Sequence, residues 1–235
     1  MPATADTAPT AGTSRPGSRS RSLLASVLLV VAAAAACTDD TAGPAPAATS
    51  SPADVEVVES AALTDDEIAG LLWMREEEQL AHDVYTALGD LWGLRIFENI
   101  AASERSHIDA VATMLGRHDI EDPAAGNEPG TFTEPAIQEL YDELLADGTV
   151  SPEAALAVGA LVEEVDIVDL RSRAATTDVA DIDALYAELE RASRNHLRAF
   201  TSQLDVRGVE YRPTELDRAA YDAIVSSETE RGRDR

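Results

Sequence analysis

A glutamate within the apolar stripe of a predicted helix is the feature that most constrains this chain. From Phe97 to Leu115 the apolar residues recur every three or four positions, which predicts a helix with one buried face. Glu104 occupies a position on that face, and His107 follows one turn later on the same side. A buried carboxylate without a partner costs several kcal/mol. We expect a metal ion as the partner, because Glu-x-x-His is the unit from which helix bundles build dinuclear sites.

Helix capping residues, glycines and prolines divide the chain into helical segments. Thr64 and Glu67 fit a capping box, which predicts the start of the first helix. We expect long helices over residues 64–89, 95–117, 151–174 and 179–205, and short helices over 134–148 and 214–225. The loop of residues 119–133 is long enough to cross the end of a bundle, and no strand pattern is present. The pattern predicts an all-α fold: an antiparallel four-helix bundle with a long crossover and one or two accessory short helices.

The first and fourth long helices supply further candidate metal ligands. Glu78 lies on the buried stripe of the first helix, whereas Glu76 and Glu77 are expected to face water. His196 lies on the buried stripe of the fourth helix, but Ser193 stands three residues before it in place of a glutamate. Serine is a poor ligand for a hard divalent ion, so this half of the site lacks one carboxylate. For His196 a hydrogen-bonded core histidine and a metal ligand are about equally expected.

The third long helix offers two adjacent glutamates. The pattern Glu-Glu-x-x-x-x-Asp occurs at 77–83 and at 163–169, which aligns Glu78 with Glu164. We therefore predict Glu164 as the ligand, with Glu163 as the alternative and otherwise a solvated residue. Asp169 is a candidate substitute for the missing glutamate.

Three further side chains have structural interpretations. His82 lies toward the edge of its stripe, and His118 ends its helix, where a partly charged imidazole favours the helix dipole; we interpret both as structural. Tyr85 is expected either to support the site by a hydrogen bond to a ligand or to be a plain core aromatic.

The N-terminal residues resemble an export signal. Three arginines precede an apolar run that ends at Cys37, the only cysteine, which fits a lipoprotein signal over 1–36 with lipidation of Cys37. An ordinary secretory signal cleaved nearby and an uncleaved membrane anchor are the alternatives. We expect residues 37–60 to form a flexible tether, 61–208 the helical domain, and 209–235 a short helix and tail. We expect an exported protein, lipid-anchored on the outer face of the cell membrane.

The net charge of -26 excludes the usual partners of basic proteins. A strongly acidic surface repels phosphate groups, so nucleic acid and anionic lipid are poor partners. Carboxylates and imidazoles without thiolate favour iron or manganese, while zinc is also compatible with these ligand types.

Four ordered segments carry a resemblance to a known family. They are residues 75–85, 96–107, 158–170 and 193–200, and together they resemble an uncharacterised bacterial domain-of-unknown-function family of the ferritin-like superfamily. Glu78 followed by Tyr85, and Glu104 followed by His107, are similar to the motifs of ferritins and rubrerythrins. The resemblance implies a ferritin-like bundle with a di-iron centre, although the second Glu-x-x-His is incomplete at Ser193.

The leading hypothesis is an exported ferritin-like protein that binds iron or manganese, with ferroxidase-like or peroxidase-like activity. Its metal ligands would be Glu78, Glu104, His107, Glu164 and His196. The alternative is a non-enzymatic helical binding or envelope lipoprotein with a partial or absent metal site, which the serine at 193 favours. A ferritin cage is not expected for a tethered chain, whereas a homodimer is compatible with it.

Overall fold

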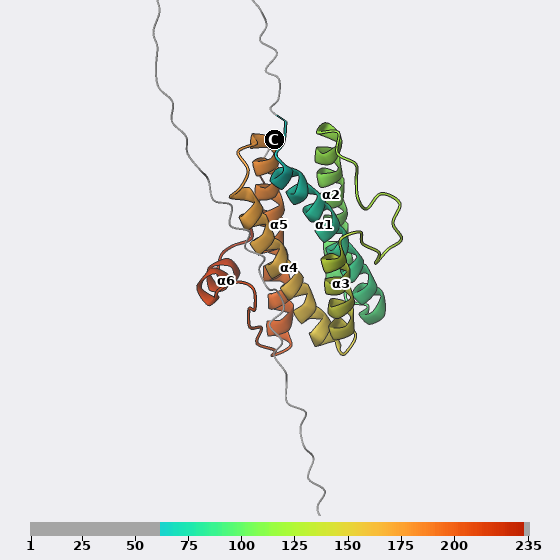
Figure 1. The fold of residues 1–235 in the computed structure, drawn as a ribbon. Helices are drawn as coiled ribbons and strands as arrows, with labels where there is room; N and C mark the ends of the chain where they lie inside the picture. Colours follow the sequence, from blue (N-terminus) through green and yellow to red (C-terminus); the bar gives the residue numbers. More distant parts are fainter. Residues whose placement is uncertain (1–61, 233–235) are drawn as a thin grey trace, which may run out of the picture. The chain divides into compact units, whose positions relative to one another are not determined.

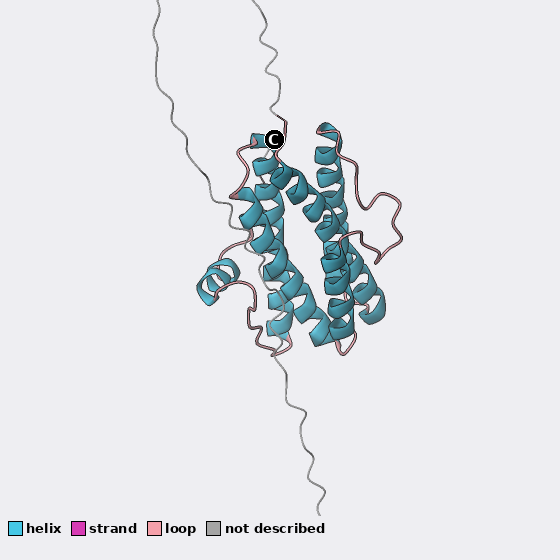
Figure 2. Cartoon of the chain, viewed as in Figure 1, coloured by secondary structure: helices cyan, strands magenta, loops and turns pink. Residues whose placement is uncertain are grey.

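The computed structural model describes residues 62–232, which form six helices and no strand and so confirm the all-α class (Figure 1, Figure 2). The helices are α1 Asp65–Trp92, α2 Arg95–Arg117, α3 Pro135–Gly148, α4 Pro152–Ala174, α5 Ala180–Val206 and α6 Arg218–Val225. None of the helices described is long and apolar enough to span a membrane. The expected signal peptide, the tether and the lipidation site Cys37 lie outside the described residues.

Local capping explains where the helices begin and end. The side chain of Thr64 accepts a hydrogen bond from the N–H of Glu67, whose carboxylate accepts one from the N–H of Thr64, so the predicted capping box is present. Gly93 ends α1 in the left-handed conformation, with φ of 65°. The last helix begins later than predicted, at Arg218, because Asp217 caps it by accepting a hydrogen bond from the N–H of Ala220.

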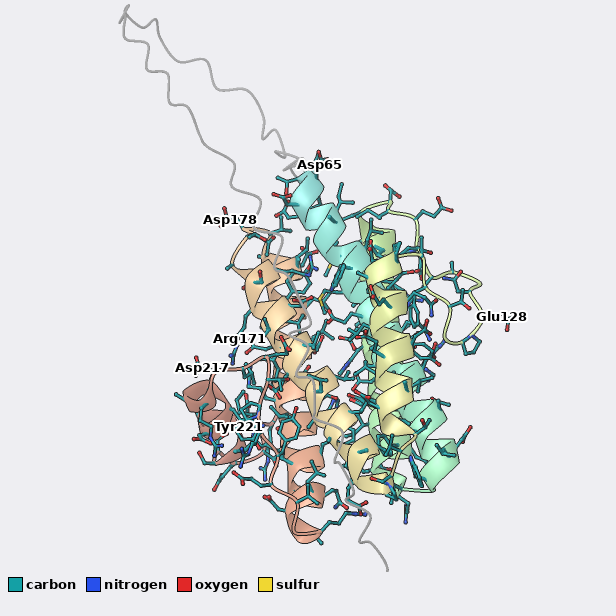
Figure 3. All side chains as sticks on the ribbon, turned by 60° about the horizontal axis from the view of Figure 1, so that its bottom comes forward. Asp65, Glu128, Arg171, Asp178, Asp217 and Tyr221 are labelled. Carbon is teal, nitrogen blue, oxygen red and sulfur yellow. The ribbon has the colours of Figure 1, made fainter. Side chains whose placement is uncertain are left out.

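The four long helices pack mainly as two pairs. Helix α1 packs along α2 and α4 packs along α5, and the pairs meet through contacts of α1 with α4 and of α2 with α5. Helix α3 packs on α1 and α4, and α6 packs on α5, on the side away from α2 (Figure 1). Side chains fill the space between the long helices (Figure 3). All four long helices therefore contribute to one interior.

That interior consists of two apolar clusters with a polar layer between them. One cluster contains Tyr85, Phe97 and Phe200, and the other contains Met74, Met114 and similar side chains. Each long helix contributes to both clusters; on α1, α2 and α5 buried polar residues lie between the two contributions, and on α4 they lie in the last turns that belong to the first cluster. These residues are Glu76, Glu77 and Glu78 of α1, Glu104 of α2, Glu163, Glu164 and Asp166 of α4, and Ser193 of α5. The sequence thus places charged groups at one level of the core.

A glycine allows the helices to approach closely beside this layer. A Cβ atom on Gly159 would lie 2.4 Å from Cε1 of Phe200, so only glycine fits there. The rings of Tyr85 and Phe97 pack against Phe200 with centroid distances of 5.2 Å and 5.4 Å. These three rings border the polar layer and bring the hydroxyl of Tyr85 to Glu163 of α4.

Candidate metal centre

Five side chains from the four long helices meet in the polar layer. We call them the central cluster; its members are Glu78 of α1, Glu104 and His107 of α2, Glu163 of α4 and His196 of α5. Within residues 62–232 they form two groups of three whose ligand atoms lie within 4.8 Å of one another. Glu104 belongs to both groups.

The first group lies between α1 and α2. The Nδ1 atom of His107 lies 3.2 Å from Oε2 of Glu78 and 2.6 Å from Oε2 of Glu104. Glu104 and His107 reach the same point because they are one helical turn apart. Glu78 faces them because α1 packs along α2.

The second group lies between α2, α4 and α5. The Nδ1 atom of His196 lies 2.9 Å from Oε1 of Glu104 and 3.5 Å from Oε1 of Glu163. Tyr85 donates a hydrogen bond of 2.6 Å to Oε1 of Glu163, which fixes that carboxylate. The two oxygens of Glu104 therefore face different histidines, and the two imidazole rings stack with a centroid distance of 5.9 Å.

The cluster is buried but incompletely hydrogen-bonded. The exposed fraction of each of its three glutamates is 3% or less. Among the atoms described, Oε1 of Glu78 has no hydrogen-bond partner, and Oε1 of Glu104 and Nδ1 of His196 face each other at 2.9 Å without regular hydrogen-bond geometry. Buried polar atoms are nearly always well paired, so incompletely paired ones among ligand-type side chains are compatible with a ligand that completes them.

Mutual contact and burial shift the pKa values in the cluster. Burial raises the pKa of Glu78 to about 7, although the charge of His107 opposes the shift. Burial alone would raise the pKa of Glu104, but hydrogen bonds and charge from His107 and His196 lower it overall. Burial alone would lower the pKa of His196, but the charge of Glu163 and a hydrogen bond to Glu104 raise it to about 10. Each imidazole thus takes the place of a cation for the carboxylates.

The structure brings four of the five predicted ligands together and replaces the fifth. Glu164 is not in the cluster, and its neighbour Glu163 occupies the predicted position. Consecutive helical residues point about 100° apart, so only one of the two can face the cluster. The carboxylate of Glu164 instead accepts hydrogen bonds from Tyr211 Oη and from the N–H groups of Glu215 and Leu216. The prediction of Glu164 over Glu163 is therefore corrected.

Two further expectations about α1 are wrong. Glu76 and Glu77 are buried, with exposed fractions of 2% and 3%, and do not face water. Glu76 accepts hydrogen bonds of 2.6 Å and 2.7 Å from the N–H groups of Thr133 and Glu134, which precede α3. Glu77 accepts one from the indole of Trp73. The segments that cover α1 come from later in the chain, so the α1 stripe did not indicate them.

Asp166 is the buried carboxylate that sequence reasoning missed. It lies one turn after Glu163 on α4, is 7% exposed, and accepts a hydrogen bond from the hydroxyl of Ser193. Asp169, the predicted substitute, is half-buried beside Arg173 at 3.9 Å and lies outside both groups of the cluster. The three-residue spacing from Glu163 to Asp166 was the available signal.

The other two histidines lie outside the cluster. The Nδ1 atom of His82 lies 2.8 Å from Oδ1 of Asp83. The Nε2 atom of His118 lies 3.9 Å from Oδ2 of Asp181, near the start of α5. Both contacts agree with a structural interpretation.

The donor set of the central cluster fits a pair of divalent ions. Glu78 with His107, and Glu163 with His196, supply one carboxylate and one imidazole to each half, and Glu104 is shared. Oxygen and imidazole ligands without thiolate suit iron and manganese. Oε1 of Glu78, which is unpaired, and Oε1 of Glu104 and Nδ1 of His196, which lie 2.9 Å apart, are all potential ligand atoms, so the residues present fit the group.

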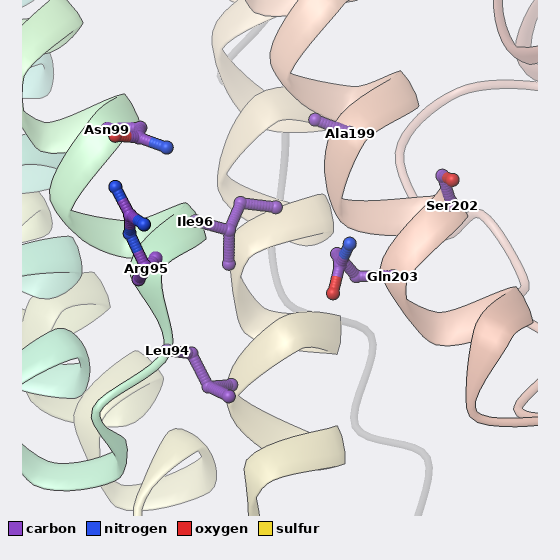
Figure 4. A pocket seen from close by; sticks show the side chains of 7 residues that line it. All are labelled: Leu94, Arg95, Ile96, Asn99, Ala199, Ser202 and Gln203. Atoms are coloured by element: carbon purple, nitrogen blue, oxygen red, sulfur yellow. The ribbon is translucent and has the colours of Figure 1, made fainter.

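A surface pocket lies apart from this centre, at the seam of α2 and α5. It has a volume of about 420 Å³ and is lined by Ile96 and Asn99 of α2 and by Ala199, Ser202 and Gln203 of α5, among others (Figure 4). No carboxylate or imidazole of the described chain lines it. The pocket therefore does not contain the candidate chemistry.

Comparisons with known proteins establish a family. The family model described as "Uncharacterized protein domain (DUF2202)" matches residues 67–228, a span that includes the whole central cluster. The chain is 44% identical over 173 residues to "Uncharacterized protein MJ0754" of Methanocaldococcus jannaschii, a match that covers 74% of this chain and 94% of the relative. The solved structure described as "Crystal structure of hypothetical protein MJ0754 from Methanococcus jannaschii DSM 2661" is similar with a TM-score of 0.70 and 43% identity, over 72% of this chain and 96% of that chain. The chain therefore belongs to the DUF2202 family of uncharacterized protein domains.

Proposed function

We propose that this domain is a ferritin-like protein that binds two iron or manganese ions in the central cluster and uses them as an oxidoreductase. The observation that carries the proposal is the position of Glu104. Its two buried oxygens lie 2.6 Å and 2.9 Å from the Nδ1 atoms of two histidines on different helices. A carboxylate shared in this way would help to hold both ions.

The arrangement of the helices supports the ferritin-like assignment. Two helix pairs, α1 with α2 and α4 with α5, are joined by a segment that includes α3. Each long helix contributes to the cluster, as in carboxylate-bridged dinuclear bundles.

The chemistry follows from what this ligand set would hold. A pair of ferrous ions would supply two electrons, which with two protons reduce dioxygen to hydrogen peroxide or hydrogen peroxide to water. The protein binds and orients the ions through its carboxylates and imidazoles, and the apolar clusters on both sides exclude bulk water. Tyr85 holds Glu163 in place by its hydrogen bond.

Metal analysis with a turnover assay tests the proposal. Metal-free protein is loaded anaerobically with ferrous iron, freed of unbound metal and analysed, and oxygen or peroxide consumption is then followed. We expect about two ions per chain, about one oxidant consumed for each pair of ferrous ions, and repeated consumption once an added reductant returns the ions to the ferrous state. Parallel loading with manganese and zinc identifies the preferred ion, and preferential zinc binding without turnover would contradict the redox role.

A non-enzymatic binding protein is the second candidate, and Ser193 favours it. The central cluster has three carboxylates, because position 193 does not supply another. One ion or none per chain, without oxidant consumption, is the result expected from this alternative.

The cellular location remains part of the proposal. We propose export and lipid attachment at Cys37, which the sequence pattern alone supports. Mass spectrometry of the mature N-terminus from cells tests it, since a diacylated cysteine at position 37 is expected. A mature chain that begins elsewhere would exclude the lipid anchor.

A further inference from the structure

Ser193 and Asp166 form a buried polar pair directly beside the central cluster. Ser193 lies one turn before His196 on α5, and Asp166 lies one turn after Glu163 on α4. The hydroxyl of Ser193 donates to Oδ2 of Asp166, and both residues are at least nine-tenths buried. The pair therefore lies next to the second group of the cluster, the one that contains Glu163 and His196, where position 193 does not supply a glutamate.

One oxygen of Asp166 has no partner. Its Oδ1 atom is buried and makes no hydrogen bond to any residue of the described chain. The charged groups that act most strongly on Asp166 are the carboxylates of Glu78, Glu77 and Glu163, and all three repel a negative charge there. No arginine compensates Asp166 within residues 62–232, in contrast to Asp169, which lies beside Arg173. A buried carboxylate in such surroundings requires a cation or a proton.

The charge of a dinuclear centre indicates whether Asp166 takes a cation or a proton. Two divalent ions carry four positive charges, whereas Glu78, Glu104 and Glu163 supply three negative ones beside neutral imidazoles. An uncompensated charge in a dry layer is costly, so a fourth carboxylate close to the ions would stabilise the loaded centre. Asp166 is the buried carboxylate placed to provide it.

On the basis of the proposed dinuclear centre, we propose that Asp166, oriented by Ser193, supplies the fourth negative charge of that centre through a hydrogen bond to a metal-bound water. Asp166 lies outside the two groups of ligand atoms, so a water between it and the ion fits its position. The carboxylate that a glutamate at position 193 of α5 would supply is thus supplied by Asp166 of α4, which Ser193 orients.

A charge-relocation experiment tests this inference. Replacing Asp166→Ala together with Ser193→Glu keeps both the number of side-chain heavy atoms and the number of carboxylates, and it moves the charge from α4 to α5. Metal affinity is measured by titration of metal-free protein with manganese. We expect Asp166→Ala alone to weaken binding of one ion by about 10–100-fold, and the double variant to restore it to within roughly threefold of wild type.

Two controls separate a role in metal binding from a structural role. Asp169→Asn removes the half-buried carboxylate on the same helix, and we expect metal affinity within about threefold of wild type. Asp166→Asn in the metal-free protein should leave the melting temperature unchanged or raised, because the variant removes an uncompensated buried carboxyl group. A purely structural residue would lower it.

The outcomes also distinguish this inference from the proposed function. Wild-type protein that binds no metal overturns both. Wild-type protein that binds two ions, with unchanged affinity in Asp166→Ala or no recovery in the double variant, overturns only the role of Asp166.

Discussion

Two sets of buried carboxylates in this protein differ in what compensates them. Glu76 and Glu164 accept hydrogen bonds from backbone N–H groups of distant segments, and each fastens such a segment to a long helix. Glu78 and Glu104 face histidines and one another; Oε1 of Glu78 has no partner among residues 62–232, and the two oxygens of Glu104 face imidazoles. The first, the satisfied set, is compensated by fixed backbone donors, whereas the second, the unsatisfied set, depends on titratable imidazoles.

The difference is sharpest between two neighbours on α4. Glu163 points into the central cluster, and Glu164 points to residues 211–216, which run beside α4 and α5 before α6. Asp217 and Tyr221 mark the continuation of this segment in Figure 3. The chain can therefore saturate a buried carboxylate with its own donors. In the central cluster it supplies only two imidazoles and one tyrosine hydroxyl, and imidazoles beside carboxylates are a metal-ligand set, which supports a cation there.

The largest effect is expected from a substitution of Glu104, which belongs to the unsatisfied set. Glu104→Gln keeps the size of the side chain and removes the charge that both halves share, so we expect loss of both ions, measured by elemental analysis after loading. The metal-free variant should fold with reduced stability, since the substitution removes the carboxylate that faces both histidines, and a folding check by circular dichroism accompanies the metal analysis. Retention of two ions would show that Glu104 is not a bridge.

The satisfied set should respond in the opposite way. Glu164→Gln weakens hydrogen bonds to Tyr211 and to the backbone before α6, and we expect a loss of about 2–3 kcal/mol in the free energy of unfolding by urea titration. The metal content should stay unchanged. Glu210→Gln, at an exposed position in the same segment, is the matched control, with a change within about 0.5 kcal/mol.

The response to pH should separate metal-free from loaded protein. Burial raises the folded-state pKa of Glu78 from 4.5 to about 7, so its contribution to stability is full below 4.5 and is lost as the pH rises through about 7. The pKa of His196, raised from 6.5 to about 10 by Glu163 and Glu104 against the effect of burial, has the same sign over a higher range. The lowered pKa of Glu104 has the opposite sign but acts only in stronger acid.

We therefore expect the melting temperature of the metal-free protein to fall between about pH 5 and about pH 9. The loaded protein should become more stable from acid to neutral pH, because protons compete with metal for the same ligands. Thermal melts of both forms across this range measure the effect. Parallel curves for the two forms would indicate that these groups do not bind the metal.

The smallest effect is expected from a substitution of Tyr85, the aromatic residue that donates a hydrogen bond to Glu163 of the cluster. Tyr85→Phe removes the hydrogen bond to Glu163 and keeps the ring packing against Phe97 and Phe200. We expect about 1 kcal/mol less stability in the metal-free protein and metal affinity reduced by roughly tenfold or less. Phe97→Leu, which disturbs packing alone, should lower stability without a separate effect on affinity.

Much of the helical architecture was predictable because its signals are local. The capping box at Thr64, the proline-initiated helices and the terminating glycines act through neighbouring residues, and the predicted long helices agree with the structure within a few residues. Glu104, with His107 one turn later, could be identified because a charged residue interrupts an otherwise apolar stripe. That interruption is visible within a single helix.

The sequence by itself thus determined the helices, their apolar faces and the charged positions on those faces. Only the tertiary structure decided that Glu163 rather than Glu164 faces the cluster, that Glu76 and Glu77 are buried, and that Asp166 lies against Ser193. Helical periodicity fixes the angle between side chains on one helix, but not which distant segment covers each side. That choice depends on contacts with residues far away in the chain, such as those before α3 and those before α6.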